Sequence, residues 1–145
     1  MDRLEYRIET KEEIMTYIAR LKYAIESGAE IKFQEVRRVD NDRELKYTNR
    51  YTMATLFPNE DPLDVLKREL LSLSEKEYIR TVKDIRLPNR SEMREFGKTY
   101  NNCDEVYIKV RVELISELVY GRHTTFVMSF HFAEIPFSEE VFPYK

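Results

Sequence analysis

Chemically active side chains recur at every second position in two segments of the C-terminal half. The segment VYIKVRVEL carries Tyr107, Lys109 and Arg111 between apolar residues. A later segment, VMSFHF, carries Ser129 and His131 in the same way. Alternate side chains of a β-strand lie on one face of its sheet. Both segments are therefore predicted to be strands with one apolar face and one polar face that bears an imidazole, a phenol and two cations.

The two strands are expected to pair as an antiparallel hairpin. A loop centred near Val119 would place Tyr107 opposite His131 and Lys109 opposite Ser129. Cross-strand neighbours stand about 5 Å apart, so these side chains would share one site. Strict alternation also assigns the residues of the last strand to two faces. Its apolar face would hold Phe126, Met128, Phe130 and Phe132, and its polar face Thr125, Val127, Ser129 and His131.

A third strand is predicted in EMREFGKTY, before the turn residues NNCD. If Phe96 lies in the core, Glu95 and Gly97 join the polar face. The length of the turn leaves this open, because a shift of one residue exchanges the faces of a strand. The function of the polar face is also open. Imidazole exchanges protons near neutral pH, but a solvated sheet face carries similar residues and a strand histidine often has a structural role.

Other chemistries find little support in the sequence. Two histidines and one cysteine, without HExxH or paired CxxC spacing, argue against a transition-metal site. No glycine-rich phosphate loop or GxSxG motif occurs, and no pair of carboxylates stands out. The single Cys103 lies in a predicted turn and is interpreted as incidental rather than nucleophilic. We therefore expect no metal and no cofactor.

The N-terminal half has helical periodicity. Thr10 and Glu13 form a capping box, and the apolar residues that follow predict a helix from Thr10 to Ser27. A strand is predicted around Ile31 and Phe33, with Val36 as a possible extension, and a turn over 39–43. Segment 44–56 is ambiguous.

Two further helices are predicted in the middle of the chain. Asp61 and Pro62 mark the start of one that continues through Leu73. A second capping box, Ser74 with Glu77, predicts a short helix over 75–82. Helices followed by strands predict an α+β fold, with N-terminal helices packed on a small antiparallel β-sheet formed mainly by the C-terminal strands.

Size and charge restrict the class of protein. The 145 residues carry a formal net charge of -3, and 42% of them are hydrophobic, which predicts one domain over residues 1–145. No apolar stretch approaches the roughly 20 residues of a membrane span, so a cytoplasmic protein without a membrane partner is expected. The acidic balance gives no overall attraction to nucleic acid, although a local cluster of cations could still bind it.

Several motifs together resemble a known family. LLSLSEKEYIR, EFGKTY, EVYIKVRVEL and FVMSFHFAEIPF, followed by VFPYK, stand in the order and spacing of the MqsR-type toxins of bacterial toxin–antitoxin systems. The resemblance covers residues 70–145, with a looser similarity in TNRYTM and the first predicted helix. It implies a fold like that of the RelE and ParE toxins. It also implies a metal-independent endoribonuclease acting on mRNA and silenced by an antitoxin protein, with DNA contacted only through that antitoxin.

The resemblance also implies roles for individual residues. By position it assigns catalytic roles to Arg80, Glu95, Tyr107 and His131, and the expected RNA contacts are Lys98, Lys109, Arg111 and Ser129. Cleaving RNA without a metal requires a base for the 2′-hydroxyl, positive charge beside the phosphorane, and an acid for the leaving 5′-oxygen. His131 or Glu95 could serve as base or acid. Guanidinium and ammonium groups suit the phosphate, and Tyr107, with an ordinary pKa of about 10, suits positioning.

Some residues differ from the family pattern and support an alternative. Glu95 stands where an uncharged residue is common, Arg94 where an aromatic one is common, and segment 29–50 is longer and more charged. These differences would suit a non-catalytic binding or regulatory protein that retains the toxin-like fold. A phage or mobile-element protein with an unrelated role is a third interpretation.

Overall fold

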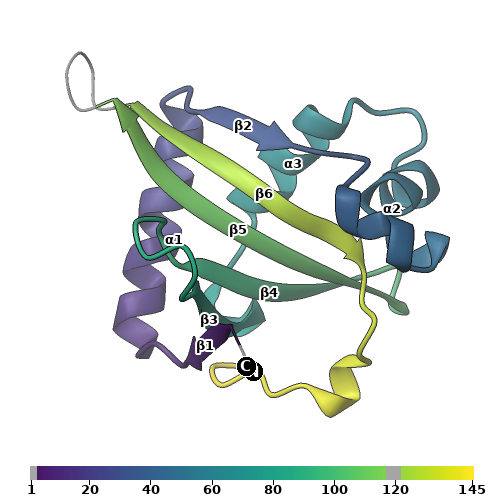
Figure 1. The fold of residues 1–145 in the computed structure, drawn as a ribbon. Helices are drawn as coiled ribbons and strands as arrows, with labels where there is room; N and C mark the ends of the chain where they lie inside the picture. The colour runs from purple at the N-terminus through teal and green to yellow at the C-terminus, as the bar shows by residue number, and fades with distance from the viewer. Residues whose placement is uncertain (1–2, 117–121) are drawn as a thin grey trace.

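The computed structural model describes residues 3–116 and 122–145, and these form a mixed, mostly antiparallel sheet with helices against it (Figure 1). The strand order is β1-β3-β4-β5-β6-β2. The strands are Leu4–Arg7 (β1), Glu30–Phe33 (β2), Tyr78–Asp84 (β3), Met93–Tyr100 (β4), Asp104–Ser116 (β5) and Arg122–Phe132 (β6). β2 lies parallel to β6, whereas the other described pairings are antiparallel. The predicted α+β class, with a sheet dominated by C-terminal strands, is confirmed.

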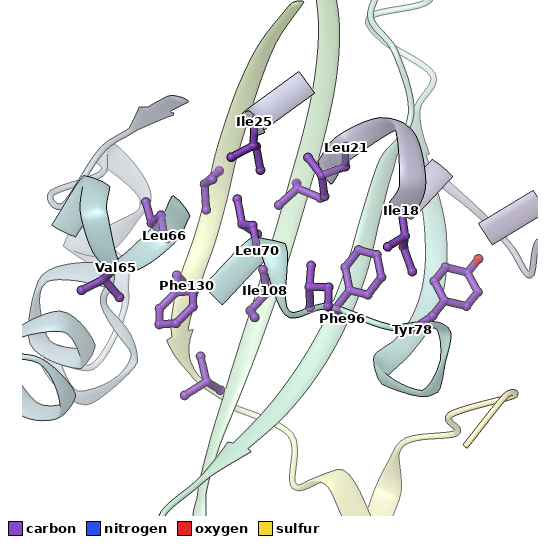
Figure 2. Packing of buried hydrophobic residues seen from close by; sticks show 14 of the residues in the cluster. Ile18, Leu21, Ile25, Val65, Leu66, Leu70, Tyr78, Phe96, Ile108 and Phe130 are labelled. Carbon is purple, nitrogen blue, oxygen red and sulfur yellow. The ribbon is translucent and has the colours of Figure 1, made fainter. Parts of the chain in front are cut away.

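Two of the three described helices cover one face of the sheet. Helix α1, Lys11–Glu26, begins at the predicted capping box of Thr10 and Glu13, and α3, Pro62–Leu71, begins at Asp61 as predicted. Figure 2 shows Ile18 and Leu21 of α1 and Leu70 of α3 packed over the strands. On the sheet side the core contains Tyr78, Phe96, Ile108 and Phe130, all with no exposed surface. Among the described residues no helix is long and apolar enough to cross a membrane.

The predicted pairing of the C-terminal strands is confirmed. Tyr107 pairs with His131 and Lys109 with Ser129. On its other side, β5 pairs with β4, where Glu95 faces Lys109. The turn between β4 and β5 places Asn101 and Asn102 at positive φ values of 53° and 64°, a conformation that asparagine tolerates better than most residues. This turn fixes the register that the sequence left open. The predicted loop around Val119 lies outside the described residues.

A β-bulge in β6 overturns part of the predicted alternation. After the pair Lys109–Ser129, the next residue of β5, Val110, pairs with Val127, so Met128 is the extra residue. An extra residue exchanges the faces of the strand on one side of the bulge. Val127 consequently lies in the core, 3% exposed, and Phe126 pairs with Arg111 on the polar face. The assignment of Phe126 and Met128 to the apolar set, and of Thr125 and Val127 to the polar one, was wrong.

The helix predicted over 75–82 is also wrong. The capping box of Ser74 and Glu77 closes a single 3₁₀ turn, Glu75–Glu77, and the chain then enters β3. Tyr78, Ile79 and Val82 are aromatic or β-branched, which favours a strand when neighbouring strands are available on both sides. β3 lies between β1 and β4. A capping box is therefore compatible with one turn and does not require a longer helix.

The ambiguous segment 44–56 forms a short 3₁₀ turn, Leu45–Tyr47, and helix α2, Asn49–Leu56, beside the end of β6 (Figure 1). β2 pairs with β6 only as far as Val127. Beyond that point, side chains of α2 form hydrogen bonds with the backbone of β6 in place of a neighbouring strand. The Asn49 amide accepts from the Phe130 N–H at 2.9 Å and donates to the Met128 carbonyl at 3.3 Å, and Thr52 Oγ1 accepts from the Phe132 N–H at 2.9 Å. These bonds hold the part of β6 that carries Ser129 and His131.

The last residues fold over the polar face rather than extending β6, which ends at Phe132. Phe137 and Phe142 pack edge to face above Gly97, where an added Cβ would lie 2.6 Å from Phe137. Tyr144 stacks on Tyr78 and donates to the Glu9 carbonyl. Residues 133–145 are called the C-terminal tail. Because Gly97 has no side chain, this tail can lie close to Tyr107, which lies on β5 and pairs with Gly97.

Replacing Asn49 by alanine should destabilise the protein by about 3 kcal/mol, because it leaves the buried Phe130 N–H and two backbone carbonyls without their partner. Urea unfolding measures this. Asn59→Ala, at an exposed asparagine, is the control and should change stability by no more than about 0.5 kcal/mol. Equal stabilities for the two variants would contradict the role given to α2.

Candidate active site

The polar face of the sheet forms the floor of an open pocket of about 510 Å³. The tail and the segment after β2 form its walls. Its charged and polar lining residues are Tyr6, Arg37, Arg43, Arg80, Glu95, Tyr107, Lys109, Ser129, His131, Glu134 and Glu140. Because β3, β4, β5 and β6 each contribute to the floor, the pocket depends on the register of the whole central sheet.

Most of the sequence-predicted site residues meet here. Arg80, Glu95, Tyr107, Lys109, Ser129 and His131 all line the pocket. The other two do not. Arg111 lines an adjoining pocket. Lys98 lies on the opposite face of β4, with Nζ 3.7 Å from Glu69 Oε1, and donates to Ser72 at the end of α3.

Glu95 is the buried anion at the centre of the site. It is 5% exposed, and Arg80 Nε lies 3.2 Å from its Oε1. The Tyr107 hydroxyl also donates a hydrogen bond to it. Burial raises the pKa of Glu95 above its usual value, and the charges of Arg80 and Lys109 only partly offset this. The carboxylate therefore depends on its cationic neighbours to remain ionised.

The groups around Glu95 respond to the same burial. Burial and the neighbouring carboxylate raise the pKa of Tyr107 well above its usual value, so the phenol keeps its proton. Burial lowers the pKa of Lys109, and Glu95 partly offsets this. For Arg80, burial lowers the pKa, but Glu95 and Glu140 outweigh it and the guanidinium stays charged. The site thus holds a neutral phenol, a fixed guanidinium and an ammonium that releases its proton more readily than usual.

His131 has a defined tautomer. Its ring lies 5.4 Å from that of Tyr107, centroid to centroid, and its Nδ1 lies 2.8 Å from the Phe132 carbonyl oxygen. A carbonyl only accepts hydrogen bonds, so Nδ1 carries the proton and Nε2 is the unprotonated nitrogen. Burial lowers the pKa of His131, and the bond to Phe132 only partly compensates. The imidazole is therefore neutral near pH 7 and able to accept a proton at Nε2.

The sequence did not predict four charged residues of the pocket, which are Arg37, Arg43, Glu134 and Glu140. Arg37 donates from Nη1 to Ser129 Oγ at 3.2 Å, and Arg43 Nε lies 3.2 Å from Glu134 Oε1. Glu140 of the tail accepts from Arg80. Arg37 and Arg43 flank a 3₁₀ turn and have no periodicity. The only signal for them was the high charge of the segment after β2, and nothing pointed to the two tail carboxylates.

Comparison of the chain with protein-family models, curated proteins and solved structures gave no match. The interpretation of the site therefore depends on its own geometry and charge.

The buried neutral His131 should make stability depend on pH. Its folded pKa lies below the usual 6.5, so the unfolded state binds more protons below that pH and the unfolding free energy falls as the solution is acidified. The slope from this residue cannot exceed about 1.4 kcal/mol per pH unit. Urea unfolding of the parent and of His131→Gln between pH 7.5 and 5.0 measures this effect. Glu95 is present in both proteins, so its opposite contribution to the pH dependence cancels in the difference between their stabilities. We expect the difference in stability between them to shift in favour of the variant as pH falls. Parallel pH profiles would contradict the lowered pKa.

Proposed function

We propose that this protein is an endoribonuclease that cuts mRNA by general acid–base chemistry without a metal ion, as the resemblance to MqsR-type toxins implies. One observation carries the proposal. A buried, neutral imidazole whose unprotonated nitrogen is Nε2 shares a pocket with a guanidinium and an ammonium. These are the groups that abstraction of a 2′-hydroxyl proton and stabilisation of a phosphorane require.

The proposed reaction begins at His131. Its Nε2 removes the proton from a ribose 2′-hydroxyl, and the 2′-oxygen attacks the adjacent phosphorus. The bond from phosphorus to the 5′-oxygen then breaks, and Lys109 protonates that oxygen. The lowered pKa of Lys109 suits it to this donation. The products are a 2′,3′-cyclic phosphate and a 5′-hydroxyl, and proton exchange with water restores the imidazole and the ammonium.

The remaining groups hold the reacting phosphate and its partners. Arg80 supplies fixed positive charge to the phosphorane oxygens. Tyr107 remains protonated, so it positions a phosphate oxygen rather than acting as a base. Glu95 lies against Arg80 and Tyr107 and is proposed as a positioning residue that keeps both in place. Its charge also keeps Lys109 protonated until the leaving oxygen needs a proton.

The proposed partners follow from the resemblance. mRNA is the substrate, and an antitoxin protein silences the enzyme and provides any contact with DNA. Within the pocket, Glu140 already forms an ion pair with Arg80, so a phosphate competes with this carboxylate for the guanidinium. A partner protein that held the tail in this position would keep Glu140 beside Arg80 and so keep the nuclease inactive.

A non-catalytic binding or regulatory protein is the second candidate. The observation that favours it is the number of carboxylates in the pocket, since Glu95, Glu134 and Glu140 all line it and each repels phosphate. Such a protein would keep the fold and the pocket but would cut no RNA. The cleavage assay below separates the two functions.

Purified protein should cut single-stranded RNA in EDTA. His131→Gln should slow cleavage by about 10²- to 10⁴-fold, the usual contribution of a general base, and Tyr107→Phe should slow it less. Lys67→Gln, at an exposed lysine of α3 on the other side of the sheet, is the control and should cut at the parental rate. Gel electrophoresis of end-labelled RNA gives the rates. Cleavage that requires added metal, or variants as fast as the parent, would refute the mechanism, and complete absence of cleavage would favour the binding protein.

A further inference from the structure

A second pocket of about 370 Å³ adjoins the first on the same face of the sheet. Arg37 lines both pockets, so its side chain lies between them. Among the residues that line the second pocket are Lys32, Arg37, Arg90, Arg111, Phe126 and Met128. These residues come from β2, the segment after it, the loop between β3 and β4, and strands β5 and β6.

The bulge in β6 builds this second pocket. Without it, Phe126 would point into the core, as strict alternation predicts. With Met128 as the extra residue, Phe126 pairs with Arg111 on the polar face, and the guanidinium of Arg111 lies 4.6 Å from the centre of the Phe126 ring. Arg111 is 6% exposed, so the stacked pair is held in place. Bulges often redirect side chains beside functional sites.

The charge of the second pocket differs from that of the first. Of the described residues that line it, four are cationic and none is a carboxylate. The first pocket balances its cations with three glutamates. A pocket lined by ammonium and guanidinium groups beside an aromatic ring suits an anion that carries a flat, apolar group.

The distance between the two pockets fits two separate parts of one extended ligand. His131 and Phe126 are paired with Tyr107 and Arg111, four residues apart on β5, which corresponds to about 13 Å along the strand. A phosphate bound at one pocket cannot contact the other, because hydrogen bonds span only about 3 Å. A ligand that binds both pockets through phosphates must therefore carry more than one phosphate along its length.

We infer that the second pocket binds a further nucleotide of the same single-stranded RNA whose scissile phosphate lies in the first pocket. This inference deepens the proposed function, and it rests on the proposed function for the identification of the ligand as RNA. The phosphate contacts Arg90 and Arg111, and the base packs against the Phe126–Arg111 pair, since bases stack on aromatic rings and on guanidinium planes. RNA binding is therefore expected to use a local basic surface despite the net charge of -3.

Binding of a non-cleavable RNA tests this inference separately from catalysis. The probes are a fluorescent 2′-O-methyl decanucleotide, which can span both pockets, and a dinucleotide, which fills only one. The variants are Arg90→Gln, at an exposed loop residue, and Phe126→Leu, which keeps an apolar side chain but removes the ring. Lys67→Gln on α3 is the matched control for lost positive charge. Fluorescence anisotropy at several salt concentrations gives affinities.

We expect Phe126→Leu to weaken decanucleotide binding about tenfold. Arg90→Gln should reduce the slope of log affinity against log salt by about 0.7, the contribution of one phosphate contact in single-stranded nucleic acid. Lys67→Gln should bind both probes as the parent does. Decanucleotide binding by Arg90→Gln and Phe126→Leu equal to that of the control would overturn the inference even if the protein cuts RNA. A parent that binds neither probe would overturn the inference and the proposed function together.

Discussion

The pairing of β5 with β6 is the constraint on which the rest of the structure depends. From Val106 to Lys109 the two strands keep strict alternation, which places Tyr107 and His131 on one face with Lys109 and Ser129. At Met128 one extra residue exchanges the faces of β6, so Val127 enters the core and Phe126 leaves it. One register therefore defines two adjoining pockets with different lining. Asn49 and Thr52 hold this part of β6 where β2 no longer pairs with it.

Charge balance sets the chemistry available on this face. Burying a carboxylate such as Glu95 is costly unless cations and donors surround it, and Arg80, Lys109 and Tyr107 fulfil that requirement. The same burial lowers the pKa of Lys109 and of His131. Burial in one pocket is thus the main cause of both shifts, although Glu95 offsets it for Lys109 and the bond to the Phe132 carbonyl offsets it for His131. The tail adds Glu134 and Glu140, which form ion pairs with Arg43 and Arg80.

Local sequence signals predicted the parts of this arrangement that local rules control. The capping box of α1, the start of α3 and the alternation around Tyr107 and His131 are confirmed because each depends on spacing within a single element. The helix predicted over 75–82 was wrong because neighbouring strands outweighed a capping signal. The bulge at Met128 has no signature in a periodic pattern, and the tail contacts depend on long-range packing above Gly97. Glu134 and Glu140 were missed for that reason, and Arg37 and Arg43 were missed because they flank a 3₁₀ turn without periodicity.

The central claim is that His131 removes a proton from a 2′-hydroxyl, and the ends of the cleaved strand test it most directly. A 2′-O-methyl RNA oligonucleotide containing one unmodified ribonucleotide, incubated with the protein in EDTA, offers a single 2′-hydroxyl, and mass spectrometry identifies the new ends. The account predicts cleavage only after the ribonucleotide, with a 2′,3′-cyclic phosphate on one fragment and a 5′-hydroxyl on the other. Cleavage of the fully 2′-O-methylated strand, fragments with a 5′-phosphate, or a strand that stays intact would contradict it.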